Sequence, residues 1–177
     1  LGFSHSGTEG NVYGDETSVM GNVWSVRPEK IYNYGPEHLA QVNAIPSTRV
    51  LDGQRIASSS WGAGEKVVIT GKLASLHLLE TELPEDAYQY VRLSAASAES
   101  YGFSFNGYDN APMKDKVSII LGSAQSTTEY IGTLRPNEVF YSNTESLRVS
   151  EMDENGFIPF VYTNRPSASA EDSVHAN

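Results

Sequence analysis

The residues of this sequence best suited to chemistry lie close to its first residue. His5 stands three positions after Gly2, and Met20 stands next to Gly21 at the end of a segment rich in glycine and polar residues. A neutral imidazole is a common zinc ligand, and glycine permits a sharp change of chain direction beside a metal. One imidazole does not make a tight zinc site, because a catalytic zinc needs three protein ligands and an open position. Taken singly, His5 is more simply a loop residue and Met20 a packing residue.

The longer string around these residues has a more specific meaning. Residues 1–7 read LGFSHSG and residues 13–21 read YGDETSVMG, with a Gly/Thr/Asn/Glu loop between them. This sequence resembles the downstream half of the zinc site in gametolysin-type metallopeptidases, a group of metzincins. Residues 101–109 also resemble, more loosely, a late strand of the same family, where an aromatic-Asn turn precedes a valine-rich strand. Here that valine-rich strand would be residues 117–121. The resemblance implies a secreted hydrolase that cuts extracellular-matrix or cell-wall proteins and therefore acts on protein or glycoprotein substrates.

The resemblance assigns a role to four residues and a Zn²⁺ cofactor to the site. His5 would be the third zinc ligand, on extended backbone below the metal, and Gly2 would turn the chain just after the helix that carries the first two ligands. Met20 and Gly21 would form the methionine turn, an apolar floor beneath the ligands. Asn22 stands where some metzincins carry a tyrosine ligand, so no tyrosine role is carried over.

The HExxH part of the family motif does not occur in these 177 residues. If the alignment holds, its second histidine lies two residues before Leu1, and its glutamate, the general base, lies further upstream. We therefore expect this chain to be the C-terminal part of a zinc metalloendopeptidase, with no catalytic residue of its own and no activity alone.

Composition excludes several classes of partner. The net charge of −10 argues against nucleic acid and against anionic membrane surfaces, and no run is long and apolar enough to cross a membrane. The chain has no cysteine, so it has neither disulfides nor a cysteine metal site. Asp15 and Glu16 could bind Ca²⁺, but capping of turns is the simpler interpretation of these residues. No other feature of the sequence supports a Ca²⁺ cofactor.

The sequence predicts an α+β fold that is mainly β, in two units and a tail. Residues 1–45 would be the C-terminal part of the catalytic domain, with a loop, the methionine turn and a short helix over residues 35–42 that exposes His38. After Pro46, short alternating runs predict an antiparallel β-sandwich-like module over residues 46–165. The expected strands are residues 66–73, 88–93, 101–105, 117–121, 129–133, 138–141, 147–152 and 157–162. Residues 166–177 lack large apolar groups, which predicts a disordered tail.

Within the second unit, three smaller expectations concern function. Tyr101, Phe103 and Phe105 alternate with small or polar residues; they could form a platform for a sugar or peptide, but core packing is the simpler interpretation. Residues 53–64 are expected to be a loop, and His77 a strand residue with a satisfied ring.

Two other functions stay open. One is a non-enzymatic secreted β-sandwich module that binds glycan or protein through Tyr and Trp, in which His5 is dispensable. The other is a pseudopeptidase whose upstream helix has lost a ligand or the general base. The coding sequence before Leu1 would separate these alternatives from the peptidase.

Overall fold

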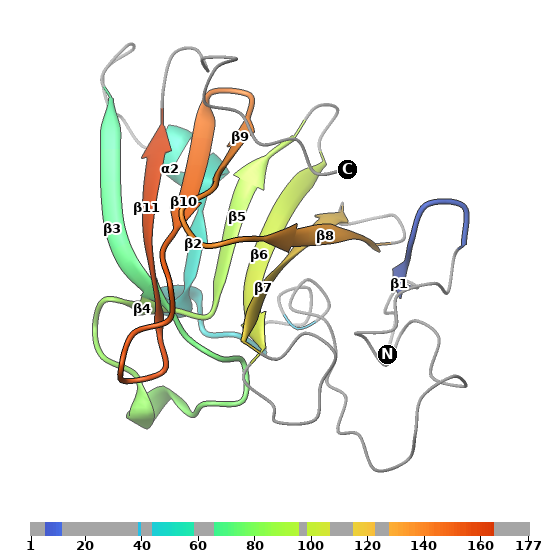
Figure 1. Ribbon diagram of the computed structural model, residues 1–177. Coiled ribbons are helices and arrows are strands. Elements are labelled where there is room, and N and C mark those ends of the chain that lie inside the picture. Colours follow the sequence, from blue (N-terminus) through green and yellow to red (C-terminus); the bar gives the residue numbers. More distant parts are fainter. Residues whose placement is uncertain are drawn as a thin grey trace, which may run out of the picture.

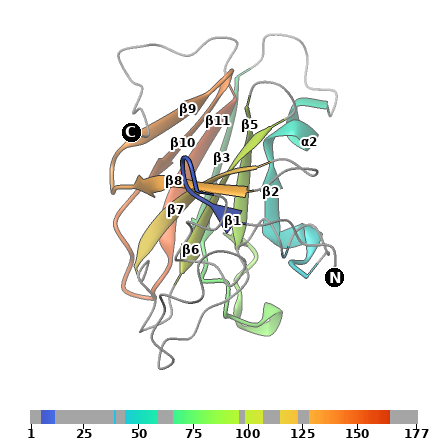
Figure 2. The ribbon, with the colours of Figure 1, turned by 90° about the vertical axis from the view of Figure 1, so that its right-hand side faces the viewer.

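The computed structural model describes residues 6–11, 39, 44–58, 66–95, 99–106, 115–122 and 128–164. These residues are mainly strand, arranged in two sheets with a few short helical segments (Figures 1 and 2). The expectation of a mainly β fold is confirmed. None of the helices in the described ranges is long and apolar enough to cross a membrane.

The first sheet has six strands in the order β1-β8-β7-β6-β5-β2. Its inner pairs, from β8 to β5, are antiparallel, whereas the outer pairs β1–β8 and β2–β5 are parallel. Within residues 46–165, the parallel β2–β5 pair departs from the expected antiparallel module, whereas β1 comes from residues 1–45. The strands are β1 (Ser6–Gly7), β8 (Thr128–Leu134), β7 (Lys116–Gly122), β6 (Ser100–Asn106), β5 (Tyr90–Ser94) and β2 (Val50–Asp52).

The second sheet has five strands in the order β4-β3-β11-β10-β9, and only its β3–β4 pair is parallel. Two connections that the structure describes in full pass from one sheet to the other: Gln89 links β4 to β5, and a turn over residues 135–138 links β8 to β9. The strands are β4 (Ala87–Tyr88), β3 (Val67–Leu73), β11 (Ile158–Asn164), β10 (Glu145–Val149) and β9 (Val139–Ser142). The short helices are α2 (Gly53–Ser58), η2 (Ser47–Arg49) and η3 (Glu80–Glu82).

The hydrophobic core lies between the two sheets and draws buried side chains from both. Phe103 of β6 and Phe140 of β9 meet edge to face across this space, with ring centroids 5.2 Å apart, and Tyr101 packs on Phe140 in the same manner at 4.9 Å. Phe103 and Phe105 are buried. The aromatic stripe of β6 is therefore core, as the simpler interpretation predicted, and the platform interpretation is wrong.

Two local expectations differ from the structure. The loop expected over residues 53–64 contains α2, whose start is stabilised by a 3.0 Å hydrogen bond from the Gln54 amide to Oδ1 of Asp52. The strand expected over residues 88–93 is interrupted at Gln89, whose side-chain amide donates to the carbonyls of Ser75 and Leu78. The break lets one continuous segment pair in both sheets. The helix expected over residues 35–42 lies outside the described residues except for Leu39, which is helical, and the tail 166–177 lies outside them entirely.

Candidate functional site

The four residues assigned to the zinc site, Gly2, His5, Met20 and Gly21, lie outside the described residues. The same holds for Asp15 and Glu16, which were considered as Ca²⁺ ligands, and for His38, which was expected on a helix surface. What the structure does describe is the chain immediately after His5.

That chain, β1, is fixed at one edge of the six-stranded sheet (Figure 1). Ser6 is paired with Thr128 and Gly7 with Glu129 of β8, in parallel. The chain then reverses in a tight turn, in which Thr8 and Asn11 exchange two backbone hydrogen bonds of 2.9 Å. Gly10 in this turn has φ of 75°, a conformation that favours glycine. A segment of the expected catalytic unit, residues 1–45, thus hydrogen-bonds to a strand of the expected sandwich; the boundary at residue 46 stays a prediction.

The described residues do not assemble a zinc site by themselves. Among them, no group of three or more His, Cys, Asp or Glu side chains is placed to hold a metal ion. His77 is exposed, and its Nδ1 lies 2.5 Å from Oγ of Ser75. It lies in a turn rather than in the strand that was expected, while its ring does have the expected hydrogen-bond partner.

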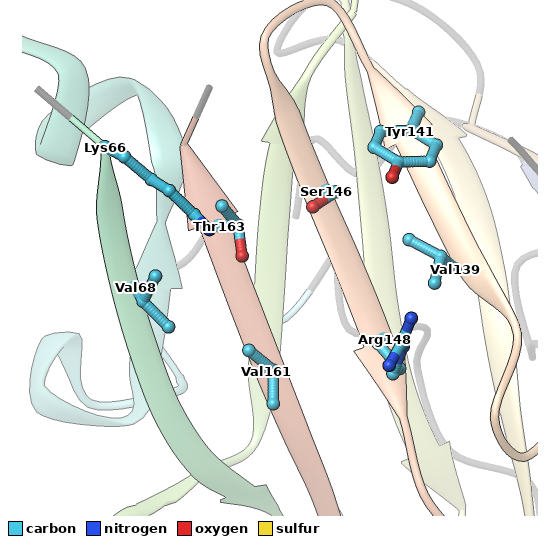
Figure 3. A pocket seen from close by; sticks show the side chains of 8 residues that line it. All are labelled: Lys66, Val68, Val139, Tyr141, Ser146, Arg148, Val161 and Thr163. Carbon is cyan, nitrogen blue, oxygen red and sulfur yellow. The ribbon is translucent and has the colours of Figure 1, made fainter. Parts of the chain in front are cut away.

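A groove crosses the outer face of the five-stranded sheet (Figure 3). The strand register places its residues in two adjacent rows, since partners opposite each other in a sheet lie side by side on one face. The first row runs Val68, Thr163, Ser146, Tyr141 across four strands. The second row contains Val161, Arg148 and Val139, and Lys66 lies just beyond the first row.

The shape of this groove follows from the sizes of these side chains. Ser146 and Thr163 are small and buried, so they form the floor, whereas Val68 and Tyr141 stand higher on either side. Val68 is 52% exposed and Val161 is 37% exposed, so apolar surface faces solvent here. The enclosed volume is about 220 Å³. This is the space of one or two side chains rather than of a whole drug-sized ligand, for which pockets span about 300–1,000 Å³.

The groove is also electropositive in a chain of net charge −10. Its eight lining residues include Lys66 and Arg148, both exposed, and no Asp or Glu. Neither cation forms an ion pair with any residue in the part of the chain that the structure describes. Figure 3 shows the Lys66 side chain extending toward Thr163. Two cationic groups that share this lining with the hydroxyl groups of Ser146, Thr163 and Tyr141 are chemically suited to hold an oxyanion.

A second polar cluster is buried at one end of the sandwich, around Glu145 of β10. Its Oε2 accepts a 2.7 Å hydrogen bond from the Ser94 amide, and its Oε1 accepts one of 2.9 Å from the Tyr162 hydroxyl. Burial first, and then the Glu145 carboxylate, raise the pKa of Tyr162 above its ordinary value. Ser142 Oγ donates to the Ser94 carbonyl beside it. Because both carboxylate oxygens are occupied, the cluster joins strands of the two sheets rather than presenting a reactive group.

Sequence reasoning missed both the groove and this cluster. The groove residues come from four strands that are far apart in the sequence, and only the pairing register brings them together. Glu145 follows an Asn-Thr turn, where an acidic residue is ordinarily solvated. No significant match to this chain was found among protein-family models, curated proteins or solved structures.

Proposed function

We propose that this chain is part of a secreted zinc metalloendopeptidase of the gametolysin type that acts on extracellular proteins or glycoproteins. The observation that carries the proposal is the sequence of residues 1–7 and 13–21, in which Gly2 and His5 fit the GxxH end of the family motif and Met20 fits its methionine. The mainly β module that follows would lie downstream of the zinc site in the intact protein.

The placement of β1 is compatible with this role. A metal ligand must be held in direction as well as in position, and His5 directly precedes a strand that is paired with β8 and closed by the Thr8–Asn11 turn. The pairing would fix the path of the chain as it leaves the ligand. His5 would bind as a neutral imidazole, so acid would compete with the metal. The zinc would supply Lewis acidity when bound.

The proposal requires two more histidines and a general base in the HExxH spacing, which these 177 residues do not contain. The decisive experiment is to determine the coding sequence before Leu1 and, where it continues, to purify the longer polypeptide. We expect His-Glu-x-x-His with its last histidine two residues before Leu1, about one zinc per chain, and chelator-sensitive cleavage of a denatured protein substrate.

The matched variants are His5→Ala and His38→Ala in that longer polypeptide. We expect His5→Ala to lose zinc and activity, because two ligands do not hold a catalytic zinc tightly. His38→Ala should keep both. Unchanged zinc content in His5→Ala would refute the assignment. An upstream helix that lacks one histidine or the glutamate would instead identify a pseudopeptidase.

The groove favours a second candidate, a non-enzymatic binding module. It is a preformed concave site with apolar walls and a few polar groups, which is the usual form of a ligand site. In this candidate the 177-residue chain binds its ligand in the presence of EDTA, and His5→Ala has no effect on binding. Ligand binding that disappears with EDTA would contradict it.

A further inference from the structure

We propose that the groove on the outer face of the five-stranded sheet binds an extended acidic segment of a protein, with a carboxylate held by Arg148 and Lys66. The inference rests on the second candidate function, the binding module, and does not depend on zinc. It is carried by the juxtaposition of two exposed cations, two buried hydroxyl residues and an exposed apolar surface on a single sheet face.

The register fixes which groups a ligand would meet. Arg148 is opposite Val161 on one side and Val139 on the other, so its guanidinium rises from a strip of aliphatic surface. Apolar groups on both sides of an exposed guanidinium strengthen its pair with a carboxylate, because they reduce the access of competing water. A carboxylate above the buried floor of Ser146 and Thr163 would therefore lie between Arg148 and Lys66.

The walls favour a peptide over a glycan. Sugar rings are usually held by flat aromatic faces together with many hydrogen-bonding side chains, whereas the walls here are three valines and one tyrosine. Val68, Val139 and Val161 suit an aliphatic side chain next to the carboxylate, and the small volume accepts one or two side chains of a chain that continues outside. A strand-like segment with alternating acidic and aliphatic residues matches both features.

The overall negative charge does not cancel this local attraction. At about 0.1 M salt the Debye length is about 10 Å, so distant carboxylates of the chain are largely screened while the two groove cations act at contact distance. The groove lining carries no acidic side chain that would compete for them. An acidic ligand is thus attracted to this face and repelled elsewhere, which adds specificity.

The test is fluorescence anisotropy with the purified chain and a fluorescein-labelled Gly-Glu-Val-Glu-Gly peptide, blocked at both ends. The matched probe is the same peptide with Gln in place of Glu. We expect the acidic probe to bind at least about tenfold more tightly than the neutral probe, and its binding to weaken as NaCl rises from about 0.05 M to about 0.5 M. Equal binding of the two probes would overturn the proposal.

Variants locate the binding. Arg148→Gln and Lys66→Gln should each weaken binding of the acidic probe by roughly fivefold to tenfold, and Val161→Glu should abolish it by placing a negative charge in the groove. Lys116→Gln, which removes one exposed cation from the other sheet, should leave binding unchanged. Circular dichroism of each variant checks the fold; the Gln substitutions are at exposed positions, where folding should survive. An equal loss with Lys116→Gln would show nonspecific charge attraction and would overturn the groove assignment.

A final arm distinguishes the ligand class. The same titrations are made with heparin, a sulfated polysaccharide that could also satisfy two cations. Binding of the acidic peptide that heparin cannot displace, or displaces only at a large excess, supports a protein segment. Tight binding of heparin through Arg148 with no binding of the peptide would overturn this inference, although the broader candidate of a binding module would survive.

Discussion

At the scale of single residues, Gly53 and Glu145 depend on each other. A Cβ atom at Gly53 would lie 1.5 Å from Oε1 and 2.7 Å from Cδ of Glu145, and that carboxylate is held in place by the Ser94 amide and the Tyr162 hydroxyl. Glycine is therefore required here for close approach and not for an unusual backbone angle. The pair connects the start of α2 to β5, β10 and β11.

We predict that Gly53→Ala lowers the free energy of unfolding by about 2–4 kcal/mol, since a buried carboxylate must move away from its donors. Urea unfolding measures this. Gln54→Ala, at an exposed position in the same helix, should change stability by no more than about 0.5 kcal/mol. Glu145→Asp shortens the side chain, so Gly53→Ala should cost less in that background. Equal costs in the two backgrounds would contradict the proposed clash.

The raised pKa of Tyr162 gives a second prediction, on alkaline stability. Because the folded-state pKa lies above the unfolded-state value of about 10, the folded state retains a proton that the unfolded state loses as the pH rises past that value. The stabilisation is complete below about pH 10. Above it, unfolding should become easier by up to about 1.4 kcal/mol per pH unit from this group.

Tyr162→Phe tests this assignment. The variant should be less stable at neutral pH by roughly 1–2 kcal/mol, because Oε1 of Glu145 loses its donor. It should also lose stability less steeply above pH 10 than the parent chain does, while the other tyrosines titrate equally in both proteins. Parallel stability curves for the two proteins from pH 9 to pH 11 would sink the assignment.

At the scale of elements, Arg49 organises the segment between β3 and β4. This buried residue at the end of η2 donates from Nη1 to the carbonyls of Pro84 and Ala87, at 2.7 and 3.1 Å, and from Nε to the Glu80 carboxylate at 2.9 Å. Several donors of one rigid guanidinium thus bond to acceptor groups of the single segment from Glu80 to Ala87. This segment leads into β4, which pairs with β3.

We predict that Arg49→Lys destabilises the chain by about 2–3 kcal/mol, although the charge is kept, because a lysine ammonium cannot reproduce the planar set of donors. Hydrogen exchange of the Lys72 and Ala74 amides, which bond to the Asp86 and Tyr88 carbonyls, should accelerate more than exchange within β6. Arg135→Lys at an exposed turn is the control and should be neutral. Exchange that is unchanged at Lys72 and Ala74 would mean that the turn does not depend on Arg49.

The strands were largely predictable, whereas the sites were not. The run of Val and Ile in β3 and the alternating aromatic residues of β6 predict strands. In a strand with one buried face, apolar and polar side chains must alternate along the sequence. The break at Gln89 was not predictable, because it depends on carbonyl groups of a distant turn. Parallel edge pairs were missed for the same reason: β1 is separated from β8 by most of the chain. The groove and the Glu145 cluster are products of pairing and have no local signature.

At the scale of the whole molecule, the described core and the residues assigned to the proposed zinc site come from different parts of the sequence. The core consists of side chains from both sheets, within residues 51–162. Among the described residues, no group of three or more His, Cys, Asp or Glu side chains is placed to hold a metal ion. A metal stabilises a fold only as far as it binds the folded state, by RT ln(1 + [L]/Kd). One ligand at His5 gives weak binding, so micromolar zinc should add little.

We therefore predict that the melting temperature of the 177-residue chain changes by less than about 1 °C between EDTA and micromolar zinc, as measured by differential scanning fluorimetry. The longer polypeptide, with a complete ligand set, should melt several degrees lower in EDTA, and His5→Ala should remove that dependence. His38→Ala should retain it. A clear rise in the melting temperature of the 177-residue chain with zinc would show that this chain assembles a metal site of its own, and the ligands would then have to be sought among its own acidic and histidine side chains.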